Sequence, residues 1–266
     1  MSMKLGIYVH IPFCASKCGY CDFYSLAGCD RLMPKYQDAL VAHIRESYGT
    51  LKSYEVDTVY FGGGTPSYYG AERLAELWTE LKNSGRVRRD AEVTLEANPD
   101  SAKLKDLKQL RREGFNRISL GVQSANNDIL KLIGRRHNWL QAEQAVQAAP
   151  SGGTVYLLAD AFAANIAVSK PLTVAPLSSD VNIYLASAAV MFNVARGASL
   201  TLTGGEYALA LDGLGISHGN ALIVSEGALT LGENVVVRNC VNTSEGGALR
   251  INNGTLEVNG AIFQNN

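Results

Sequence analysis

The spacing of apolar residues in the first part of the chain switches between two periods. Short runs rich in β-branched residues predict strands, and apolar residues that recur every three or four positions predict helices. The predicted strands cover residues 5–11, 57–61, 92–97 and 117–122. The predicted helices cover residues 34–48, 71–81, 102–113, 126–133 and 140–148. A strand–helix unit that repeats about four times indicates parallel strands joined by crossover helices, and so an α/β fold.

Two residues predict the ends of one of these helices. Ser101 precedes the apolar positions of residues 102–113, and its hydroxyl can cap the free amides of the first turn. Gly114 follows the same segment and suits the left-handed conformation in which many helices end.

The pattern changes near residue 150, where a helical stretch gives way to Pro and Gly. Beyond this point apolar and polar residues alternate, and the alternation breaks at Gly or Asn. Residues 227–232 and 254–260 share a G-x-L-x-(L/V) core, and residues 197–202 fit it with one insertion. Copies roughly 27 to 30 residues apart are typical of solenoids, and about four to five coils fit here. The segment resembles a right-handed parallel β-helix of the pectate-lyase or surface-adhesin kind.

Single residues of this second part have structural interpretations. Asparagines stand at its predicted corners, where a short amide side chain tolerates tight turns; they are Asn239, Asn252, Asn253, Asn265 and Asn266. Cys240 is expected to be a small core residue. This segment has neither a clustered Asp pair for calcium nor a Lys/Arg constellation repeated across coils, so its sequence does not predict catalysis. No polar cap follows the last copy, so exposed strand edges are expected to favour aggregation or pairing with another chain.

Composition supports a division into residues 1–149 and 150–266. About 20 of the 24 Lys and Arg residues precede Pro150. Hydrophobic residues make up 47% of the 266 residues, enough for a sizeable core. The net charge of −1 gives no reason to expect nucleic acid or an anionic membrane as a partner. No apolar stretch reaches the length of a membrane span, and no signal-peptide pattern opens the chain. Cysteines kept as reduced thiolates for iron imply a reducing compartment, so a cytoplasmic protein is expected.

Three cysteines follow the first predicted strand at a C-x3-C-x2-C spacing: Cys14, Cys18 and Cys21. Thiolates are soft ligands that suit iron–sulfur clusters and zinc. In a [4Fe–4S] cluster three thiolates leave one iron open, and that iron can take the amino and carboxylate groups of S-adenosylmethionine. Structural zinc normally has four ligands, and the nearest spare cysteine is Cys29. Because five cysteines in 266 residues do not indicate a disulfide framework either, the spacing favours a cluster.

Other residues suited to ligand binding also follow predicted strands. The glycine triplet at residues 62–64, Glu96 and Gln123 are of this kind, and strand-end loops build the active site of barrel folds. Glycine there lets the backbone approach a ligand closely, although a plain turn also explains the triplet. Taken singly, Glu96 is also explained as a solvated carboxylate or a cap, and Gln123 and Arg135 as surface or capping residues.

Five segments together resemble one family closely. They are Tyr8-Val9-His10-Ile11-Pro12-Phe13-Cys14, the cysteine loop ending in Tyr20-Cys21-Asp22-Phe23, Phe61-Gly62-Gly63-Gly64-Thr65-Pro66-Ser67, Glu96-Ala97-Asn98-Pro99-Asp100 and Arg117-Ile118-Ser119-Leu120-Gly121-Val122-Gln123-Ser124. About residues 4 to 149 are similar to the radical S-adenosylmethionine (radical SAM) superfamily, and within it to the oxygen-independent coproporphyrinogen III oxidase-like group. The resemblance implies a partial (β/α) barrel of about four units.

The resemblance also implies metal and cofactor residues. Cys14, Cys18 and Cys21 would ligate a [4Fe–4S] cluster. The positions that contact S-adenosylmethionine in this family correspond to Tyr8, Tyr20, Gly63, Gly64, Thr65, Glu96, Gln123 and Arg135. Reductive cleavage of this cofactor would give methionine and a 5′-deoxyadenosyl radical.

One position separates two branches of the group. Where the oxidase has a further cysteine two residues after the third, this chain has Phe23, and residues 22–25 are more similar to the heme chaperone branch. Heme or a porphyrin is therefore an expected small-molecule partner. That branch's His-Asn-Arg-x-Tyr-Trp stretch is absent from the sequence, as are two further strand–helix units. Two functions stay open: a radical SAM protein of heme or porphyrin metabolism, and a non-catalytic fusion of an inactive barrel remnant with an adhesin-like β-helix.

Overall fold

The computed structural model describes residues 3–124, 126–148, 152–157, 160–176, 179–217, 221–242 and 246–266. The chain divides into two compact units. The first unit comprises residues 1–122 and 128–148, and the second comprises residues 123–127 and 149–266. No helix in the described ranges is long and apolar enough to cross a membrane.

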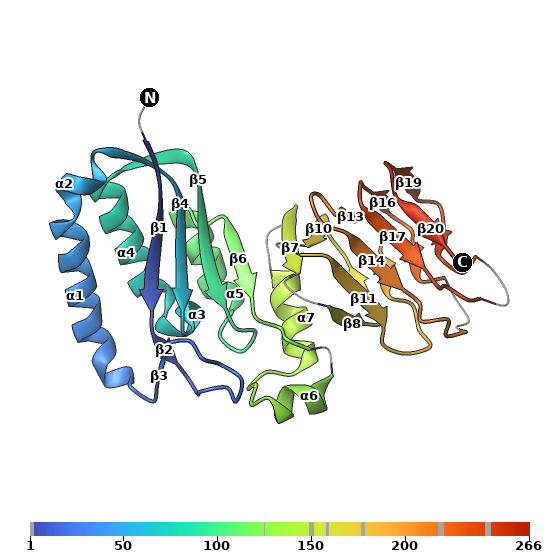
Figure 1. Ribbon diagram of the computed structural model, residues 1–266, viewed down its shortest axis with the longest axis horizontal. Helices are drawn as coiled ribbons and strands as arrows, with labels where there is room; N and C mark the ends of the chain where they lie inside the picture. The colour runs from blue at the N-terminus through green and yellow to red at the C-terminus, as the bar shows by residue number, and fades with distance from the viewer. Residues whose placement is uncertain are drawn as a thin grey trace. The chain divides into compact units, whose positions relative to one another are not determined.

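The first unit is built on a sheet of four parallel strands in the order β1-β4-β5-β6 (Figure 1). These strands are β1 (Met3–Ile11), β4 (Tyr54–Gly63), β5 (Arg86–Ala97) and β6 (Arg117–Leu120). Two short strands, β2 (Phe13–Cys14) and β3 (Leu26–Ala27), pair in parallel beside them. The four predicted strands are confirmed, and their chain-order neighbours pair as a strand–helix repeat requires.

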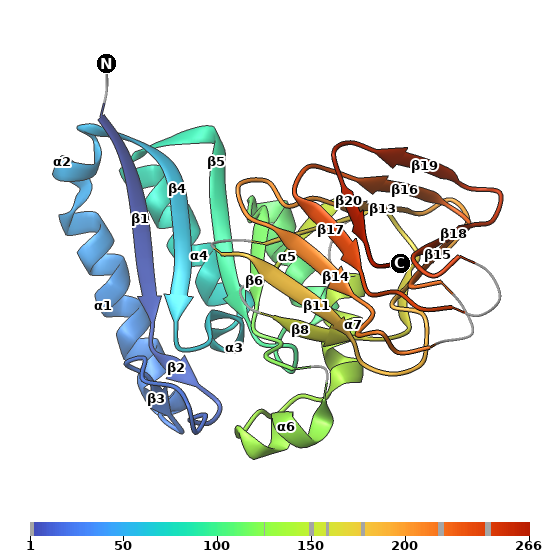
Figure 2. The ribbon, with the colours of Figure 1, turned by 45° about the vertical axis from the view of Figure 1, so that its right-hand side comes forward.

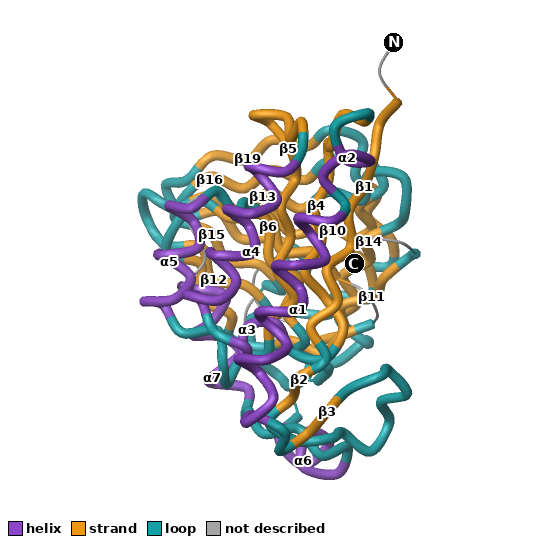
Figure 3. Tube along the Cα trace, turned by 90° about the vertical axis from the view of Figure 1, so that its left-hand side faces the viewer, coloured by secondary structure: helices purple, strands orange, loops and turns teal. Residues whose placement is uncertain are grey.

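Helices connect the strands of this sheet and cover one of its faces. The connecting helices are α1 (Met33–Glu46), α2 (Tyr48–Leu51), α3 (Pro66–Tyr69), α4 (Ala71–Ser84) and α5 (Leu104–Glu113), with a 3-10 turn at Asp30–Leu32. Two more helices, α6 (Asn127–Leu132) and α7 (Trp139–Ala148), follow the last strand of the sheet. Figure 3 looks onto α1, α4 and α5 with the strands behind them. Their apolar sides form one buried cluster with the strand residues that point toward them.

The sheet has two chemically different faces because side chains alternate along each strand. Val59 and Phe61 of β4 and Leu95 of β5 belong to the buried cluster under the helices. Tyr60 and Glu96 stand at the alternate positions and hydrogen-bond to each other on the opposite face. The polar residues of neighbouring strand ends therefore share one face of the sheet.

The two predicted ends of α5 have different outcomes. Gly114 ends the helix in the left-handed region with a φ of 118°, as predicted. The expected Ser101 cap is wrong, because the residue preceding the helix is Lys103 and no side chain caps it. The Ser101 hydroxyl instead contacts the Ser67 hydroxyl at 2.6 Å and donates to the Asn98 carbonyl at 3.2 Å. Ser101 thus joins two strand-end loops.

The second unit contains three sheets of parallel strands. The first sheet pairs β7 (Gly153–Leu157), β10 (Leu172–Pro176), β13 (Ser199–Leu202), β16 (Ala228–Leu231) and β19 (Thr255–Val258). The second pairs β8 (Ala161–Ala163), β11 (Val181–Leu185), β14 (Leu209–Asp212), β17 (Val235–Arg238) and β20 (Ile262–Gln264). The third pairs β9 (Ile166–Val168), β12 (Phe192–Val194), β15 (Ile223–Ser225) and β18 (Leu249–Ile251). The chain visits the three sheets in turn, so each of the first four rounds adds one strand to each stack, and β19 and β20 extend the first two (Figure 2).

The register explains the sequence repeat. Leu172, Leu200, Leu229 and Leu256 pair in one row at intervals of 27 to 29 residues. The repeated glycine is needed because a Cβ on Gly254 would overlap the carbonyl oxygen of Gly227 in the preceding round. The three copies noticed in the sequence therefore hold equivalent places in neighbouring rounds.

Three of the five predicted corner asparagines and the predicted core residue Cys240 are confirmed, whereas Asn252 and Asn266 do not adopt a left-handed φ. Asn239, Asn253 and Asn265 adopt left-handed φ angles of 55°, 57° and 52°. Cys240 is only 2% exposed and packs in the core, and burial raises the pKa of its thiol to about 11. In the last round, Leu256, Val258 and Phe263 are 43% to 44% exposed, whereas their row partners Leu229 and Val237 are buried.

This difference in burial within one row predicts different costs of truncation. Leu229→Ala is expected to lower the free energy of unfolding by roughly 3 kcal/mol, because Leu229 is 1% exposed between two neighbouring rounds. Leu256→Ala is the matched control and is expected to cost only about 1 kcal/mol, since its side chain is 44% exposed. Urea unfolding of the full chain measures both. Equal costs would contradict the stacked core.

Candidate functional site

The cysteine loop is fastened to the sheet by a short parallel strand pair. Cys14 is the last residue of β2, and it pairs with Ala27 of β3. The Leu26 amide donates to the Pro12 carbonyl at 2.7 Å and closes the base of the loop. Within the loop, the Cys21 amide donates to the Cys18 carbonyl at 3.2 Å and forms a tight turn. All three cysteines are free thiols and half-buried.

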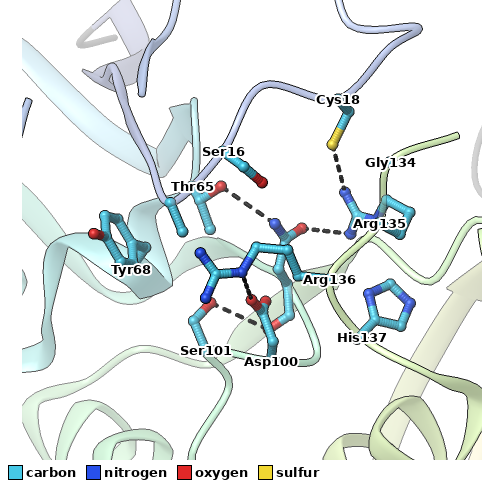
Figure 4. A pocket seen from close by; sticks show the side chains of 12 residues that line it. Ser16, Cys18, Thr65, Tyr68, Asp100, Ser101, Gly134, Arg135, Arg136 and His137 are labelled. Carbon is cyan, nitrogen blue, oxygen red and sulfur yellow. Dashed lines mark hydrogen bonds and ion pairs between the residues drawn. The ribbon is translucent and has the colours of Figure 1, made fainter. Parts of the chain in front are cut away.

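A continuous set of hydrogen bonds joins the sulfurs of two of these cysteines. Thr65 Oγ1 lies 3.4 Å from Cys14 Sγ, and Asn98 Nδ2 donates to the same hydroxyl at 3.3 Å. Arg135 Nη2 donates to Asn98 Oδ1 at 2.7 Å. Arg135 Nη1 points to Cys18 Sγ at 3.7 Å (Figure 4). Three separate strand-end or helix-end loops therefore converge on the cysteine loop.

Arg135 reaches the loop from the turn after α6. The Gly19 amide donates to the Ile133 carbonyl at 3.3 Å, so this turn docks directly on the cysteine loop. The guanidinium also donates to the Tyr20 hydroxyl at 3.4 Å and to the Gly121 carbonyl. Its Nε is buried and has no hydrogen-bond partner among the described residues. Burial raises the pKa of Tyr20, and the nearby Arg135 charge partly opposes that shift.

Arg135 also lines a pocket beside the cysteine loop. Ser16, Tyr68, Asp100, Ser101 and Arg136 line its other walls (Figure 4). Arg136 forms an ion pair with Asp100 at 3.5 Å, and its side chain remains 58% exposed, as a surface residue would be.

The glycine triplet at residues 62–64 packs against the chain itself. The Gly64 amide donates to the Ile11 carbonyl and the Thr65 amide to the Phe13 carbonyl, both at 2.8 Å. A Cβ on Gly64 would lie 2.6 Å from the Pro12 oxygen, and one on Gly63 would lie 2.6 Å from the His10 ring. The absence of side chains here thus lets the β4 end approach the segment that leads into the cysteine loop.

Glu96 is held by two donors on the polar face of the sheet. Its two carboxylate oxygens accept from the Tyr60 hydroxyl at 2.7 Å and from the Gly63 amide at 3.0 Å. Glu96 is thus half-buried and hydrogen-bonded to its own chain. Burial, and then the hydrogen bond to Glu96, raise the pKa of Tyr60 to about 12, so its hydroxyl remains a donor at neutral pH. Tyr8 stacks on Tyr60 with ring centroids 5.9 Å apart.

Gln123 is the last of the predicted site residues, and two histidines lie near the site. Gln123 is exposed, has a φ of 70°, and lies in the segment 123–127 that groups with the second unit. His10 Nδ1 lies 3.4 Å from the Tyr8 hydroxyl, and its Nε2 lies 3.2 Å from the Tyr24 carbonyl. His137 is 4% exposed, with Nε2 lying 3.0 Å from the Val122 carbonyl. Both histidines thus have structural partners.

Burial of His137 predicts a pH dependence of stability. Burial, and then the Arg135 charge, lower the pKa of His137 below its usual value of 6.5. The unfolded chain then binds this proton more readily, so stability is expected to fall as pH falls through about 6.5. Urea unfolding at a series of pH values measures the slope. His137→Gln is expected to flatten it, and an unchanged slope in this variant would contradict the assignment.

Eight of the eleven predicted residues fall into two connected groups, to which Cys21, Gly64 and Gln123 do not belong. Cys14, Cys18, Tyr20, Thr65 and Arg135 share the hydrogen bonds described above. Tyr8, Gly63 and Glu96 meet around Tyr60 on the polar face of the sheet. The sequence analysis did not identify Asn98 and Tyr60 as site residues. A signal was present for both, because Asn98 lies in the segment 96–100 that resembles the family, and Tyr60 alternates with buried residues just before the glycine triplet.

The chemistry of the cysteine loop can be compared with that of an iron–sulfur site, in which each cysteine binds a different iron. Within the described ranges, no group of three or more His, Cys, Asp or Glu residues is arranged to hold a metal ion. Free thiols on one loop, with donors directed at Cys14 and Cys18, fit an iron–sulfur cluster, since hydrogen bonds to ligand sulfurs are a regular part of cluster sites.

Comparisons with known proteins agree on one superfamily. A family model described as "Radical SAM superfamily" matches residues 8–157, more than half of the chain. The heme chaperone HemW of Buchnera aphidicola subsp. Schizaphis graminum is 37% identical over 144 residues, which are 54% of this chain and 38% of the chaperone. The oxygen-independent coproporphyrinogen III oxidase of Salmonella typhimurium is 35% identical over 141 residues, which are 50% of this chain and 30% of the oxidase.

A solved structure extends the agreement to the fold. Coproporphyrinogen III oxidase (HemN) from Escherichia coli, described as a radical SAM enzyme, superimposes with a TM-score of 0.54 at 27% identity. The match covers 61% of this chain and 38% of that one. The chain spans about two fifths or less of the length of these relatives.

Proposed function

Because the chain belongs to the radical SAM superfamily, we propose that its first unit binds a [4Fe–4S] cluster through Cys14, Cys18 and Cys21. The observation that carries the proposal is the hydrogen-bonded path from Cys14 Sγ through Thr65, Asn98 and Arg135 to Cys18 Sγ. Donors directed at two ligand sulfurs are what an anionic cluster requires from its surroundings.

We further propose that this unit binds S-adenosylmethionine beside the cluster. The contact residues would be Tyr8, Tyr20, Gly63, Gly64, Thr65, Glu96, Gln123 and Arg135. Glu96 supports this role because the Tyr60 hydroxyl and the Gly63 amide fix its carboxylate in place, ready to accept from ligand hydroxyls. When bound together, cluster and cofactor supply reductive cleavage to a carbon radical. The protein's part is to orient the cofactor and to exclude water.

The finer assignment is to the heme chaperone branch, with heme or a porphyrin as partner. Phe23 stands where the oxidase has a cysteine, and the matched relatives include heme chaperones. Phe23 and Tyr24 are 69% and 72% exposed on the cysteine loop, an apolar surface that suits a flat tetrapyrrole. Heme titration of the full chain tests this assignment, and the absence of a heme spectrum at saturating heme would contradict it.

For the second unit we propose a right-handed parallel β-helix over residues 150–266, joined to a partial barrel over residues 1–149. The support is the cyclic order of strands through three parallel sheets and the division of the chain near residue 149. This unit has its own buried core, which also favours the alternative of a non-catalytic adhesin-like protein with an inactive barrel remnant.

One experiment separates the two functions. The full chain is reconstituted anaerobically with iron and sulfide and then reduced with S-adenosylmethionine present. A radical SAM protein is expected to turn brown, with about four irons per chain, and to release methionine and 5′-deoxyadenosine. A colourless, folded protein would favour the non-catalytic alternative.

A further inference from the structure

Asn98 lies at the centre of the contacts that reach the cysteine loop. It follows β5 directly, and its side-chain amide uses both of its polar atoms. Nδ2 donates to Thr65 Oγ1 at 3.3 Å, and Oδ1 accepts from Arg135 Nη2 at 2.7 Å. Thr65 in turn contacts Cys14 Sγ, and Arg135 contacts Cys18 Sγ. The Asn98 amide therefore contacts both side chains, Thr65 and Arg135, that reach the sulfurs of two proposed cluster ligands.

The donor and acceptor pattern gives these contacts a direction. Asn98 Nδ2 donates to Thr65 Oγ1, which lies 3.4 Å from Cys14 Sγ. A cluster-bound thiolate has no hydrogen and can only accept, so with the cluster present the Thr65 hydroxyl would donate to Cys14 Sγ. Because Asn98 Oδ1 and the Gly121 carbonyl hold Nη2, the guanidinium plane is fixed with Nη1 toward Cys18 Sγ. Each sulfur thus receives one donor whose orientation depends on Asn98.

Asn98 is itself held in place by its backbone. Its amide donates to the Ser67 hydroxyl at 3.1 Å, and its carbonyl accepts from the Ser101 and Ala102 amides at 3.0 Å and 2.9 Å. Pro99 follows and restricts the backbone of Asn98 further. Such a side chain is suited to positioning its neighbours, because little freedom is left in its own main chain.

We propose that Asn98 is a positioning residue that holds hydrogen-bond donors on the sulfurs of Cys14 and Cys18 and thereby raises the reduction potential of the cluster. The inference rests on the proposed function, since it requires the cluster to be present. Reduction adds negative charge to the cluster, and donors and a guanidinium beside its sulfurs stabilise that charge. Removing the orientation of both donors should make the cluster harder to reduce.

The test is a redox titration of the anaerobically reconstituted full chain, followed by electron paramagnetic resonance without S-adenosylmethionine. Asn98→Leu keeps the approximate size of the side chain and removes both amide contacts. It is expected to lower the ratio of reduced to oxidised cluster by about tenfold at a fixed ambient potential, which is a shift of about 60 mV to more negative values for one electron.

Two further variants identify the route of the effect. Thr65→Val removes only the donor to Cys14 and is expected to give a smaller negative shift. In the double variant Thr65→Val with Asn98→Leu, the shift in reduction potential should be smaller than the sum of the two single shifts, because Asn98 acts on Cys14 through Thr65. A fully additive pair would overturn this route.

A matched asparagine serves as control. Asn116 also uses both atoms of its amide, but it accepts from the Val93 amide and donates to the Ala91 carbonyl, away from the cysteines. Asn116→Leu is expected to lower stability and to leave the potential unchanged.

An unchanged potential in Asn98→Leu would overturn the inference and leave the proposed function standing. If the unsubstituted chain takes up no cluster, the proposed function itself fails. If the Asn98→Leu variant fails to hold a cluster, the reduction potential of Thr65→Val is the test. A negative shift there supports the inference, and an unchanged potential overturns it.

Discussion

Serine at position 14, 18 or 21 is expected to reduce the bound iron from about four atoms per chain to nearly none. A hydroxyl is a hard, weakly acidic group and a poor substitute for a thiolate on iron. The loss should be similar for the three single substitutions, because a cluster with two protein ligands is not retained. Iron and acid-labile sulfide are measured after anaerobic reconstitution and desalting.

The two remaining cysteines provide matched controls. Cys29 donates to the Ala27 carbonyl at 3.5 Å, and Cys240 is buried in the second unit with its thiol pKa raised to about 11. Cys29→Ser and Cys240→Ser should therefore retain the iron content of the unsubstituted chain. Loss of iron in Cys29→Ser would show a ligand set different from the one proposed.

Gly64→Ala is expected to detach the cysteine loop from the sheet. Its Cβ would lie 2.6 Å from the Pro12 oxygen and 2.8 Å from the Phe13 oxygen, and both are backbone atoms that cannot turn aside. The substitution should cost roughly 2 kcal/mol in stability. It should also remove most of the bound iron, because Phe13 and Cys14 form the strand that anchors the loop.

Gly49→Ala is the control for this substitution. Gly49 lies in α2, and a Cβ there would meet nothing within 4 Å. Alanine at this helical position should leave stability equal or slightly higher, with iron content unchanged. Normal iron content in Gly64→Ala would show that the close approach of β4 to the cysteine loop is not needed for binding.

The elements of the first unit followed from periodicity wherever apolar residues were regularly spaced. The strand predicted at residues 92–97 begins earlier, at Arg86, because its first half is charged and carries no alternating apolar signal. Helix α3 at Pro66–Tyr69 was missed because four residues are too few to show a helical period. Long apolar patterns thus predicted the strands of the sheet, whereas short or charged segments gave no periodic signal from which their structure could be predicted.

The second unit shows the same limit in another form. The repeated Gly and Leu positions revealed β13, β16 and β19, because one row of leucines pairs in register. Strands of the other two sheets are three to five residues long and lack a shared motif, so only their alternation was visible. The number of sheets depends on where the corners fold, which long-range packing decides.

The candidate site was predicted in its residues and only partly in its contacts. The spacing of the cysteines pointed to a cluster, whereas the contact of Arg135 with Cys18 was not predicted, because Arg135 reaches the loop from the turn after α6 and not from a strand end. The role of Asn98 was not predictable, because an amide before a proline looks like an ordinary turn residue. Its importance appears only when the distances to two separate loops are known.

The central claim is an iron–sulfur cluster with one iron free to bind S-adenosylmethionine. Its most direct test is the electron paramagnetic resonance spectrum of the reduced, reconstituted chain before and after addition of S-adenosylmethionine. The g values of the cluster signal are expected to change on addition, because the cofactor would coordinate the open iron. A spectrum that is identical with and without the cofactor, or a signal that persists when Cys14, Cys18 and Cys21 are all replaced by serine, would contradict it.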